Sequence, residues 1–334
     1  MDSRDGDVTL LRNSDLLDYL AERQLISGAA TATTLAGGVS NVVVSVTTAT
    51  RSLVVKQSLP RLRVASEWLA TRSRLLNEAE CLRIQHSLTP QNVPRVISLD
   101  ETRFVLVIEA APPDWVAWKS ELLAGRVNPE VASRLGEILA TWHSATTRID
   151  ALPRRLRDTK AFDELRVDPF YRELARRHPE LALPLGDLIE AMRDRAGCLV
   201  HGDYSPKNVL VGASGLWVID AEVAHYGDPT FDVAFLICHL TLKAIRDSAS
   251  APALNASSAR FVDSYLLNLR TDVGLPKWQP EHLRAQVGAL LLARVEAKSP
   301  VDYLDTEQQI RASELGRRLL TAPDDDRDDP WRRS

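Results

Sequence analysis

The sequence predicts an α+β protein of two lobes, a small N-terminal lobe with an antiparallel sheet and a larger, mainly helical C-terminal lobe. In the first third of the chain, short segments rich in β-branched residues alternate with turns, which is typical of paired strands. Further along, apolar residues recur three and four positions apart, which indicates amphipathic helices. The Ala-Ala-Pro-Pro stretch at 110–113 separates the two patterns. We therefore expect lobes at 1–110 and 111–322, followed by a charged, disordered tail at 323–334.

The N-terminal lobe is predicted to begin with a helix over 14–28, because Ser14 can cap a run of periodically spaced leucines. Two glycines, Gly37 and Gly38, then interrupt a run dominated by threonine and valine, which predicts two strands joined by a glycine turn. The remaining elements expected in this lobe are a third strand at 53–57, a helix at 73–85 and two more strands at 93–100 and 104–108.

The C-terminal lobe is predicted to be helical because its apolar residues keep helical spacing over long segments. A segment at 247–258 is rich in serine and alanine, and we expect it to be a mobile linker. The helices expected in this lobe lie at 129–146, 163–178, 185–196, 231–245, 259–269, 281–297 and 306–320.

The composition limits the classes of partner. A formal net charge of −4 argues against a protein whose affinity rests on contacts with nucleic-acid phosphates. The three cysteines are widely spaced within apolar runs, which favours buried free thiols in a reducing compartment. The polar first residues do not resemble a signal peptide, and no apolar run approaches the roughly 20 residues that a membrane span needs. We expect a cytoplasmic protein, monomer or homodimer, without nucleic-acid or membrane partners.

The most informative segment is 200–222, which contains His-Gly-Asp-x-x-x-x-Asn and then an acidic pair, Asp220 and Glu222. The spacing from Asp203 to Asn208 equals that of the kinase catalytic loop, H-R-D-x-x-x-x-N, with Gly202 in place of the arginine. Phosphoryl transfer from ATP requires one carboxylate to orient the attacking hydroxyl, and a carboxamide and a second carboxylate to hold magnesium. This segment supplies all three.

Together with Gly-Asp-Pro-Thr-Phe-Asp at 227–232, this segment resembles the aminoglycoside phosphotransferase superfamily, which includes choline kinases and methylthioribose kinases. The resemblance extends from about 35 to 320 and implies a protein-kinase-like fold and ATP-dependent phosphorylation of a small molecule. Residues 54–63 and 91–96 are most similar to the methylthioribose kinase branch. The twin-arginine substrate motif of that branch is not clearly present, and Arg294 stands in for part of it.

The predicted catalytic residues are Asp203, which orients the acceptor hydroxyl and takes its proton, and Asn208, which also binds magnesium. Asp220 is expected to bridge the metal to the phosphates. Glu222, which would point to the same side in an extended segment, is also predicted to bind the metal. Lys207 is expected near the γ-phosphate or the acceptor, with an exposed loop lysine as the alternative. His201 and Asp232 are expected to be structural. Arg294 is the remaining acceptor-binding prediction.

The predicted nucleotide site centres on Lys56, because a lysine inside an apolar strand needs a ligand or a partner. We expect the α- and β-phosphates as its ligand and Glu78 as its partner, with Glu80 as the competitor on another helix face. The glycine turn is expected to cover the phosphates, and adenine to bind backbone groups at the hinge. The residues involved are Gly37, Gly38, Ser40 and Asn41 in the turn, and Glu109 and Ala111 at the hinge.

These assignments predict a kinase that uses ATP and Mg²⁺ to phosphorylate an alcohol, on a sugar or sugar-like metabolite. An aminoglycoside phosphotransferase is one alternative, since Asp302, Asp305 and Glu307 could hold ammonium groups, although Arg294 and Lys298 nearby weaken that idea. A catalytically silent kinase-like binding module is another. A protein kinase is disfavoured, because the segment after Asp220 leaves little room for an activation loop.

Overall fold

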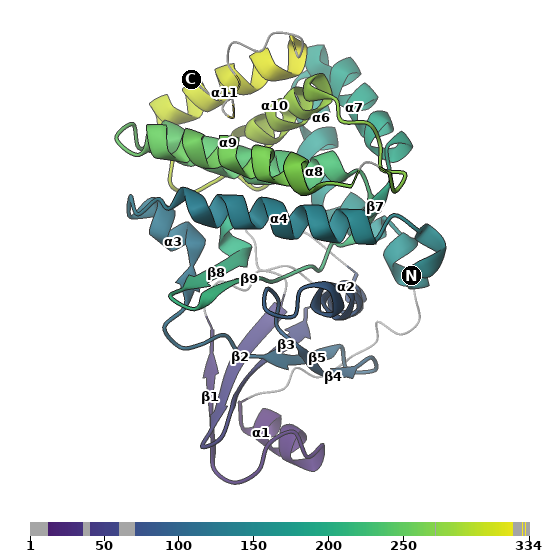
Figure 1. Cartoon of the computed structure of the whole chain (residues 1–334), viewed down its shortest axis with the longest axis vertical. Helices are drawn as coiled ribbons and strands as arrows, with labels where there is room; N and C mark the ends of the chain where they lie inside the picture. The colour runs from purple at the N-terminus through teal and green to yellow at the C-terminus, as the bar shows by residue number, and fades with distance from the viewer. Residues whose placement is uncertain are drawn as a thin grey trace.

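The computed structural model describes residues 13–35, 41–59, 71–270 and 272–322, together with residues 329 and 331. A sheet with helix α1 (Asn13–Glu22) lies at one end of the molecule and the long helices lie at the other (Figure 1). The separation of an antiparallel sheet from a mainly helical part confirms the predicted fold class. The lobe limits at 110 and 322 stay a prediction.

The sheet of the smaller lobe has five antiparallel strands in the order β1-β2-β3-β5-β4. Alternate residues of a strand face opposite sides, so Val55 packs with α1 on one face while Leu106 and Ile108 join the main core on the other. The strands are β1 (Ala30–Thr34), β2 (Asn41–Thr48), β3 (Ser52–Ser58), β4 (Val96–Asp100) and β5 (Val105–Glu109).

Helix α2 (Arg74–Leu88) covers the second face of this sheet, and its leucines enter the main core. The alternation that buries Val55 beneath α1 therefore turns Lys56 towards α2. Its position next to a buried helix explains how a lysine can lie inside an apolar strand.

Two small sheets carry the predicted catalytic segment. One pairs β7 (Cys198–Val200) with β10 (His225–Gly227), and the other has the order β6-β8-β9. The loop 201–208 leaves β7 and enters β8, and the acidic segment 219–224 connects β9 to β10. The strands of the second sheet are β6 (Val116–Ala117), β8 (Val209–Gly212) and β9 (Gly215–Val218).

The larger lobe is a set of packed helices, with α4 lying along α9, and α10 between α8 and α11 (Figure 1). Aromatic residues such as Phe231, Phe235 and Phe261 are buried between them. The helices are α3 (Trp118–Leu123), α4 (Pro129–Ala145), α5 (Lys160–Phe162), α6 (Glu173–Arg177), α7 (Ala182–Asp194), α8 (Pro229–Arg246), α9 (Ala251–Asn268), α10 (Pro280–Glu296) and α11 (Thr306–Thr321).

The predicted linker at 247–258 is wrong, because α9 begins at Ala251. A proline in the first turn suits a helix start. The hydroxyls of Ser257 and Ser258 donate to Ala253 O at 2.8 Å and Leu254 O at 3.2 Å, so these buried serines are satisfied within the helix.

One other prediction needs correction. The helix expected at 163–178 is π-helical at 163–172, where Pro169 lacks a backbone donor, before α6 follows. The disordered tail expected at 323–334 stays a prediction. Of its residues the structure describes Asp329, whose Oδ1 accepts from Arg284 Nε at 2.7 Å, and Trp331, which packs against the helical core. The other residues of 323–334 lie outside the described part.

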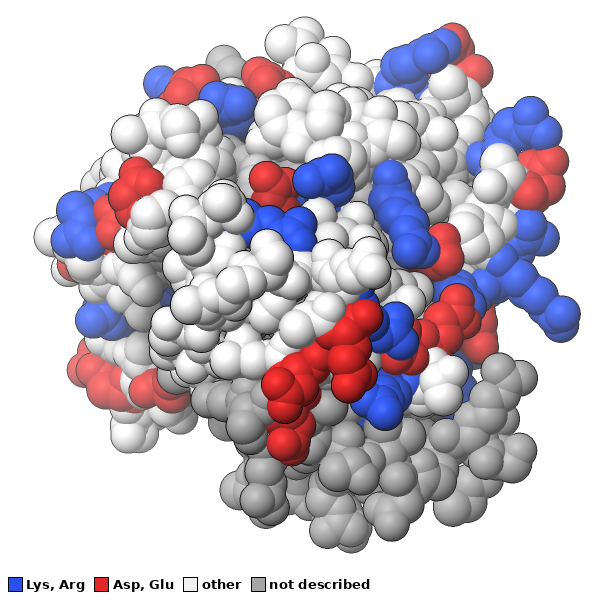
Figure 2. Space-filling model, turned by 90° about the horizontal axis from the view of Figure 1, so that it is seen from below, with Lys and Arg blue, Asp and Glu red and all other residues white. Residues whose placement is uncertain are grey.

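Charged residues of both signs lie side by side on the face shown in Figure 2. Within the described ranges, no helix has the length and apolar character that crossing a membrane requires. All three cysteines are buried and free, as expected from their apolar neighbours.

Candidate active site

Three charged side chains from different elements meet at the boundary between the sheet and the helical lobe. Lys56 Nζ of β3 lies 2.6 Å from Glu78 Oε1 of α2 and 2.8 Å from Asp220 Oδ1. Lys56 is 5% exposed and Glu78 is fully buried. Burial alone would lower the pKa of Lys56, but the carboxylates of Asp220 and Glu78 outweigh it and raise this pKa above its usual range. Glu78, and not Glu80, is therefore the partner of Lys56.

Asp203 lies in the loop between β7 and β8 and is held by three side chains. Asn208 Nδ2 donates to Asp203 Oδ2 at 2.8 Å, and Lys207 Nζ lies 2.8 Å from the same oxygen. Arg166 Nη2, from the π-helical segment, lies 2.9 Å from Asp203 Oδ1. Burial raises the pKa of Asp203, but the charges of Arg166 and Lys207 outweigh it and lower this pKa below its usual value. Asp203 is thus an ionised acceptor at neutral pH.

The loop backbone is fixed by Asp232 in the first turn of α8. His201 N and Gly202 N donate to its carboxylate at 2.7 and 2.8 Å, and His143 Nε2 lies 3.3 Å from Oδ2. This is the scaffold role expected for Asp232.

His201 also has the structural role expected from the sequence. Its Nδ1 accepts from Asp203 N at 3.2 Å, so the ring proton is on Nε2, which lies 3.1 Å from Ile219 O. Burial lowers the pKa of His201, which keeps the ring neutral. The imidazole thereby connects the loop of Asp203 to the segment of Asp220.

Asp220 follows β9 in a strained conformation, with φ of +71°. The adjacent Ile219 N donates to Asn208 O at 2.9 Å, which sets Asp220 beside the catalytic loop. Burial raises the pKa of Asp220, but the ammonium groups of Lys56 and Lys207 outweigh it and lower this pKa strongly. Asp220 is therefore anionic.

These residues fit a magnesium ion. Within the described ranges, Asp220 Oδ2 and Asn208 Oδ1 have no hydrogen-bond partner, and both are hard oxygen donors. Magnesium uses one or two protein carboxylates and completes its shell with phosphate and water oxygens, so this donor set is sufficient.

Glu222 lies beyond Asp220 with Oε2 already engaged. Asn41 Nδ2 donates to it at 3.3 Å and Arg74 Nε at 3.2 Å. Arg74 is buried and also donates to Leu59 O at 2.9 Å. Among the described residues, Oε1 of Glu222 has no partner, and the metal role of Glu222 stays a prediction. Asn41, predicted to bind the nucleotide, here joins the sheet to the acidic segment.

The predicted hinge lies at the end of β5. Ala110 N donates to Ser52 O at 3.3 Å, so the backbone groups of Glu109 point away from β3, and Glu109 N donates to Arg95 O at 3.0 Å. Ala111 N has no backbone partner among the described residues. Its N–H therefore remains available to a ligand.

The other predicted residues are placed differently. Gly37, Gly38 and Ser40 lie outside the described residues. Arg294 lies near the end of α10, where its charge and that of Asp203 interact. Sequence reasoning missed Arg166 and Arg74, since an arginine in a helical pattern is usually solvated. The only local signal at Arg166 is its position between the apolar Leu165 and Val167.

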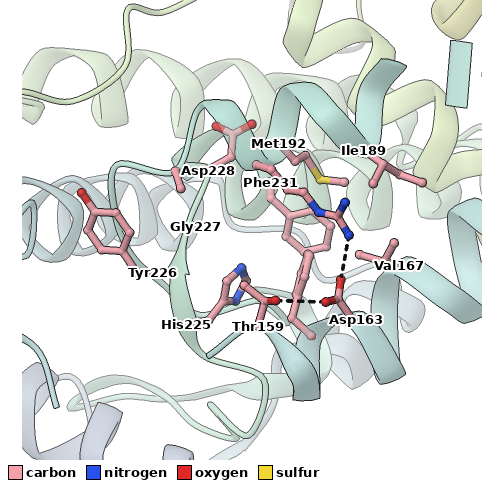
Figure 3. Close-up of a pocket in the computed structure, with 13 residues that line it drawn as sticks. Thr159, Asp163, Val167, Ile189, Met192, His225, Tyr226, Gly227, Asp228 and Phe231 are labelled. Carbon is pink, nitrogen blue, oxygen red and sulfur yellow. Dashed lines mark hydrogen bonds and ion pairs between the residues drawn. The ribbon is translucent and has the colours of Figure 1, made fainter. Parts of the chain in front are cut away.

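A separate cavity of about 140 Å³ lies in the helical lobe, and none of the predicted site residues lines it (Figure 3). Its walls are mainly apolar, with Phe231, Met192 and Ile189, and Asp163 accepts from Thr159 Oγ1 at 2.9 Å on one side. This cavity is distinct from the cluster around Asp203.

Comparisons with known proteins agree with this geometry. The model of the phosphotransferase enzyme family, APH, matches residues 31–267. Methylthioribose kinase 2 of Oryza sativa subsp. japonica is 26% identical over 236 residues, covering 62% of this chain and 55% of that protein. Methylthioribose kinase of Citrobacter koseri is 28% identical over 239 residues, covering 61% and 60%. The matched part of the chain thus covers less than two thirds of the length of these relatives.

Two solved structures share the fold. A choline/ethanolamine kinase family protein from Mesorhizobium loti has a TM-score of 0.57 and 16% identity, covering 94% of this chain and 96% of its own. An amicoumacin kinase in complex with AMP-PNP, Ca²⁺ and Ami has a TM-score of 0.56 and 14% identity, covering 92% and 93%. Since the family match extends over most of its length, the chain belongs to the phosphotransferase enzyme family and has the protein-kinase-like fold that its catalytic motif implied.

Proposed function

We propose that this protein transfers the γ-phosphoryl group of ATP to an alcohol hydroxyl of a small molecule, on a sugar or sugar-like metabolite. The observation that carries the proposal is the meeting of Lys56, Glu78 and Asp220 beside the loop of Asp203 and Asn208. These are the residue types that phosphoryl transfer requires, and they come from four separate elements. The methylthioribose kinase relatives support a sugar-like acceptor.

Asp203 would accept the hydrogen bond of the acceptor hydroxyl and take its proton. Arg166, Asn208 and Lys207 hold the carboxylate in place. The acceptor oxygen forms a bond to the γ-phosphorus while the bond from that phosphorus to the β–γ bridging oxygen breaks, and ADP leaves. Lys56 would bind the α- and β-phosphates, and Lys207 would approach the transferred group. Catalysis then comes mainly from positioning and electrostatic stabilisation.

Magnesium, when bound, neutralises the phosphate oxygens, and Asn208 and Asp220 are the residues that would hold it. Adenine would bind at the hinge, through backbone groups of Glu109 and Ala111.

The aminoglycoside alternative is less well supported. Asp305 caps α11, accepting from Gln308 N at 2.8 Å, and Asp302 lies 3.8 Å from Lys119 Nζ. Two of the three acidic residues that could hold ammonium groups therefore already have partners. The silent-module alternative is opposed by the complete set of catalytic side chains.

The test is Mg²⁺-dependent ATP consumption over a panel of sugars and amino alcohols, with detection of the phosphorylated product. We expect Asp203→Asn to lower turnover by about 10² to 10⁴-fold while the binding of AMP-PNP is kept. Asp187→Asn, on an exposed face of α7, is the matched control. Normal turnover in Asp203→Asn would remove Asp203 from the mechanism. A wild-type protein that transfers phosphate to no acceptor of the panel would refute the proposed kinase activity.

A further inference from the structure

A group of basic side chains lies on the helical side of the catalytic loop. Lys119 comes from α3, Lys243 from α8 and Arg294 from α10. The Nζ atoms of Lys119 and Lys243 lie 5.6 and 5.2 Å from the centroid of the Tyr303 ring. Two separate helices thus bring lysines to one tyrosine, and the charge of Arg294 also acts on it.

Lys243 is the most unusual member of this group, because it is 2% exposed and has no counter-ion among the described residues. Its Nζ donates to His239 O at 3.1 Å, which uses one of its three hydrogens. Burial, and then the charge of Lys119, lower the pKa of Lys243 to about 7. A buried ammonium group is costly unless it is paired, so this position is explained best by a ligand.

Arg294 and Tyr303 also have unused donors. Arg294 Nη1 donates to Ser299 O and, at 3.0 Å, to Ser299 Oγ, while its buried Nε has no partner among the described residues. The hydroxyl of Tyr303 is likewise buried and without a partner in the described part of the chain. Burial raises the pKa of Tyr303, so the hydroxyl keeps its proton and can donate.

Carboxylates are scarce around these groups. Among the residues that the structure describes, no Asp or Glu lies within ion-pair distance of Lys243 or Arg294. Asp302 lies 3.8 Å from Lys119, but its side chain is 87% exposed. The charges of Lys119, Arg294 and Arg246, which act on Lys243, are all positive.

The group lies within reach of the catalytic loop. Asp232 binds the loop backbone at the start of α8, and His239 and Lys243 follow on the same stripe, seven and eleven positions later. Eleven residues correspond to about 16 Å along the helix, and side chains lean back towards the N-terminus. Burial lowers the pKa of His239, and the charges of Lys243, Arg294, Lys207 and Lys119 lower it further. The charges of all four side chains therefore act on His239, which lies between Asp232 and Lys243 along α8.

We propose that the acceptor carries an anionic group, a phosphate monoester or a carboxylate, which Lys243, Arg294 and Tyr303 bind while the acceptor hydroxyl lies at Asp203. This inference rests on the proposed function and narrows its substrate class. It disfavours a polycationic acceptor, which the same side chains would repel, and it predicts that a neutral sugar binds less well than its anionic counterpart.

The experiment compares matched pairs of probes, ribose with ribose 5-phosphate and glucose with glucuronate. Their affinities are measured by titration calorimetry of the full chain with saturating Mg²⁺ and AMP-PNP, so that the nucleotide phosphates occupy their own site. We expect at least one anionic probe to bind about ten- to a hundredfold more tightly than its neutral partner, as charge-assisted hydrogen bonds would give. The pair that shows the preference distinguishes phosphate from carboxylate.

Lys243→Met and Arg294→Met should each reduce this preference to within about threefold, as expected when one charge-assisted contact is lost. Lys160→Met, at an exposed lysine, should retain it. Both methionine variants remove a poorly compensated charge, and their melting temperatures verify that they are folded. Equal or tighter binding of the neutral probes by the wild type, or a preference that survives both variants, would overturn the proposal. Failure of the kinase itself would be seen separately, as anion binding without any phosphoryl transfer.

Discussion

Gly202 is the residue at which the catalytic loop leaves β7, and its φ is +74°. A Cβ at this position would lie 2.8 Å from Val223 Cγ2 and 2.9 Å from Val223 O. Kinase catalytic loops carry arginine at this point of the motif, whereas here the neighbouring cation is Arg166, whose Nε donates to Gly202 O at 3.0 Å. The glycine lets the loop approach the acidic segment closely, and a more distant helix supplies the charge.

Gly202→Ala should lower the free energy of unfolding by about 2 to 5 kcal/mol, from the left-handed backbone and the overlap with Val223. Gly28 has the same φ of +74°, but a Cβ added there would meet nothing within 4 Å. Gly28→Ala therefore isolates the backbone contribution, about 1 to 2 kcal/mol. Urea unfolding of both variants measures the difference. Equal losses at the two positions would show that Val223 can move aside.

In the proposed mechanism Arg166 acts on the acceptor through Asp203, with which it forms an ion pair, so it is a positioning residue. We expect Arg166→Gln to lower kcat by about 10- to 100-fold, because Asp203 loses one of the three groups that orient it, while KM for ATP stays within about twofold. Arg172→Gln, on the same helical segment and exposed, is the control. Steady-state kinetics with varied ATP concentration measures kcat and KM separately. A rise in KM for ATP without a fall in kcat would contradict the positioning role of Arg166.

Helix α8 is the element that connects the proposed reaction centre to the hydrophobic core. Its first turn holds the catalytic loop through Asp232, and His143 of α4 and Tyr265 of α9 extend the network, with His143 Nδ1 2.9 Å from the tyrosine hydroxyl. The loop geometry therefore depends on how three helices pack.

Asp232→Asn should destabilise the fold by about 3 to 5 kcal/mol near neutral pH, because a buried, fully bonded carboxylate is replaced by a group with one acceptor. Burial raises the pKa of Asp232, but the hydrogen bond and charge of His143 outweigh it, and this pKa lies below its usual value. A depressed pKa contributes stability above the unfolded value, about 3.9, and loses it as pH falls through the folded value. The difference in the free energy of unfolding between wild type and Asp232→Asn should therefore become smaller only below about pH 4.

Urea unfolding at a series of pH values from about 7 down to 3 measures this gap. Asp187→Asn, at an exposed aspartate, should leave stability unchanged throughout. A gap that is constant across the series would mean that the charge of Asp232 does not contribute.

The parts of the site that could be predicted from sequence are those set by local spacing. Asp203 and Asn208 lie on one loop, and the apolar strand around Lys56 required a partner on the adjacent helix. Arg166 and Arg74 could not be found this way, because their partners lie 37 and 148 positions away, at Asp203 and Glu222.

Among the elements, alternating valines identified the strands and periodic leucines the helices. The prediction of a linker at 247–258 was wrong because alanine and serine occur both in loops and in helices. Packing against α4 and α8 decides between the two structures here. The widened turn at Pro169 likewise depends on its surroundings.

Over the whole molecule, charged residues join the sheet to the helical lobe at the proposed nucleotide site. Lys56 connects β3 to Asp220 at 2.8 Å, and Asn41 and Arg74 contact Glu222 at 3.3 and 3.2 Å. Asp220 belongs to both the ion pair with Lys56 and the predicted metal site. Binding of nucleotide and metal should thus act on the contact between the lobes, and not only on one of them.

Saturating Mg²⁺ and AMP-PNP should therefore raise the stability of the protein by about 3 kcal/mol at a ligand concentration 100 times its Kd. Chelation of the metal with EDTA should remove most of this gain, because the phosphates then lack their link to Asn208 and Asp220. The Asp220→Asn variant should not gain stability from Mg²⁺ and AMP-PNP, whereas the Asp187→Asn control should gain as much as the wild type. Thermal unfolding with and without metal measures the effect, and an equal gain without Mg²⁺ or in Asp220→Asn would exclude the metal site assigned to this carboxylate.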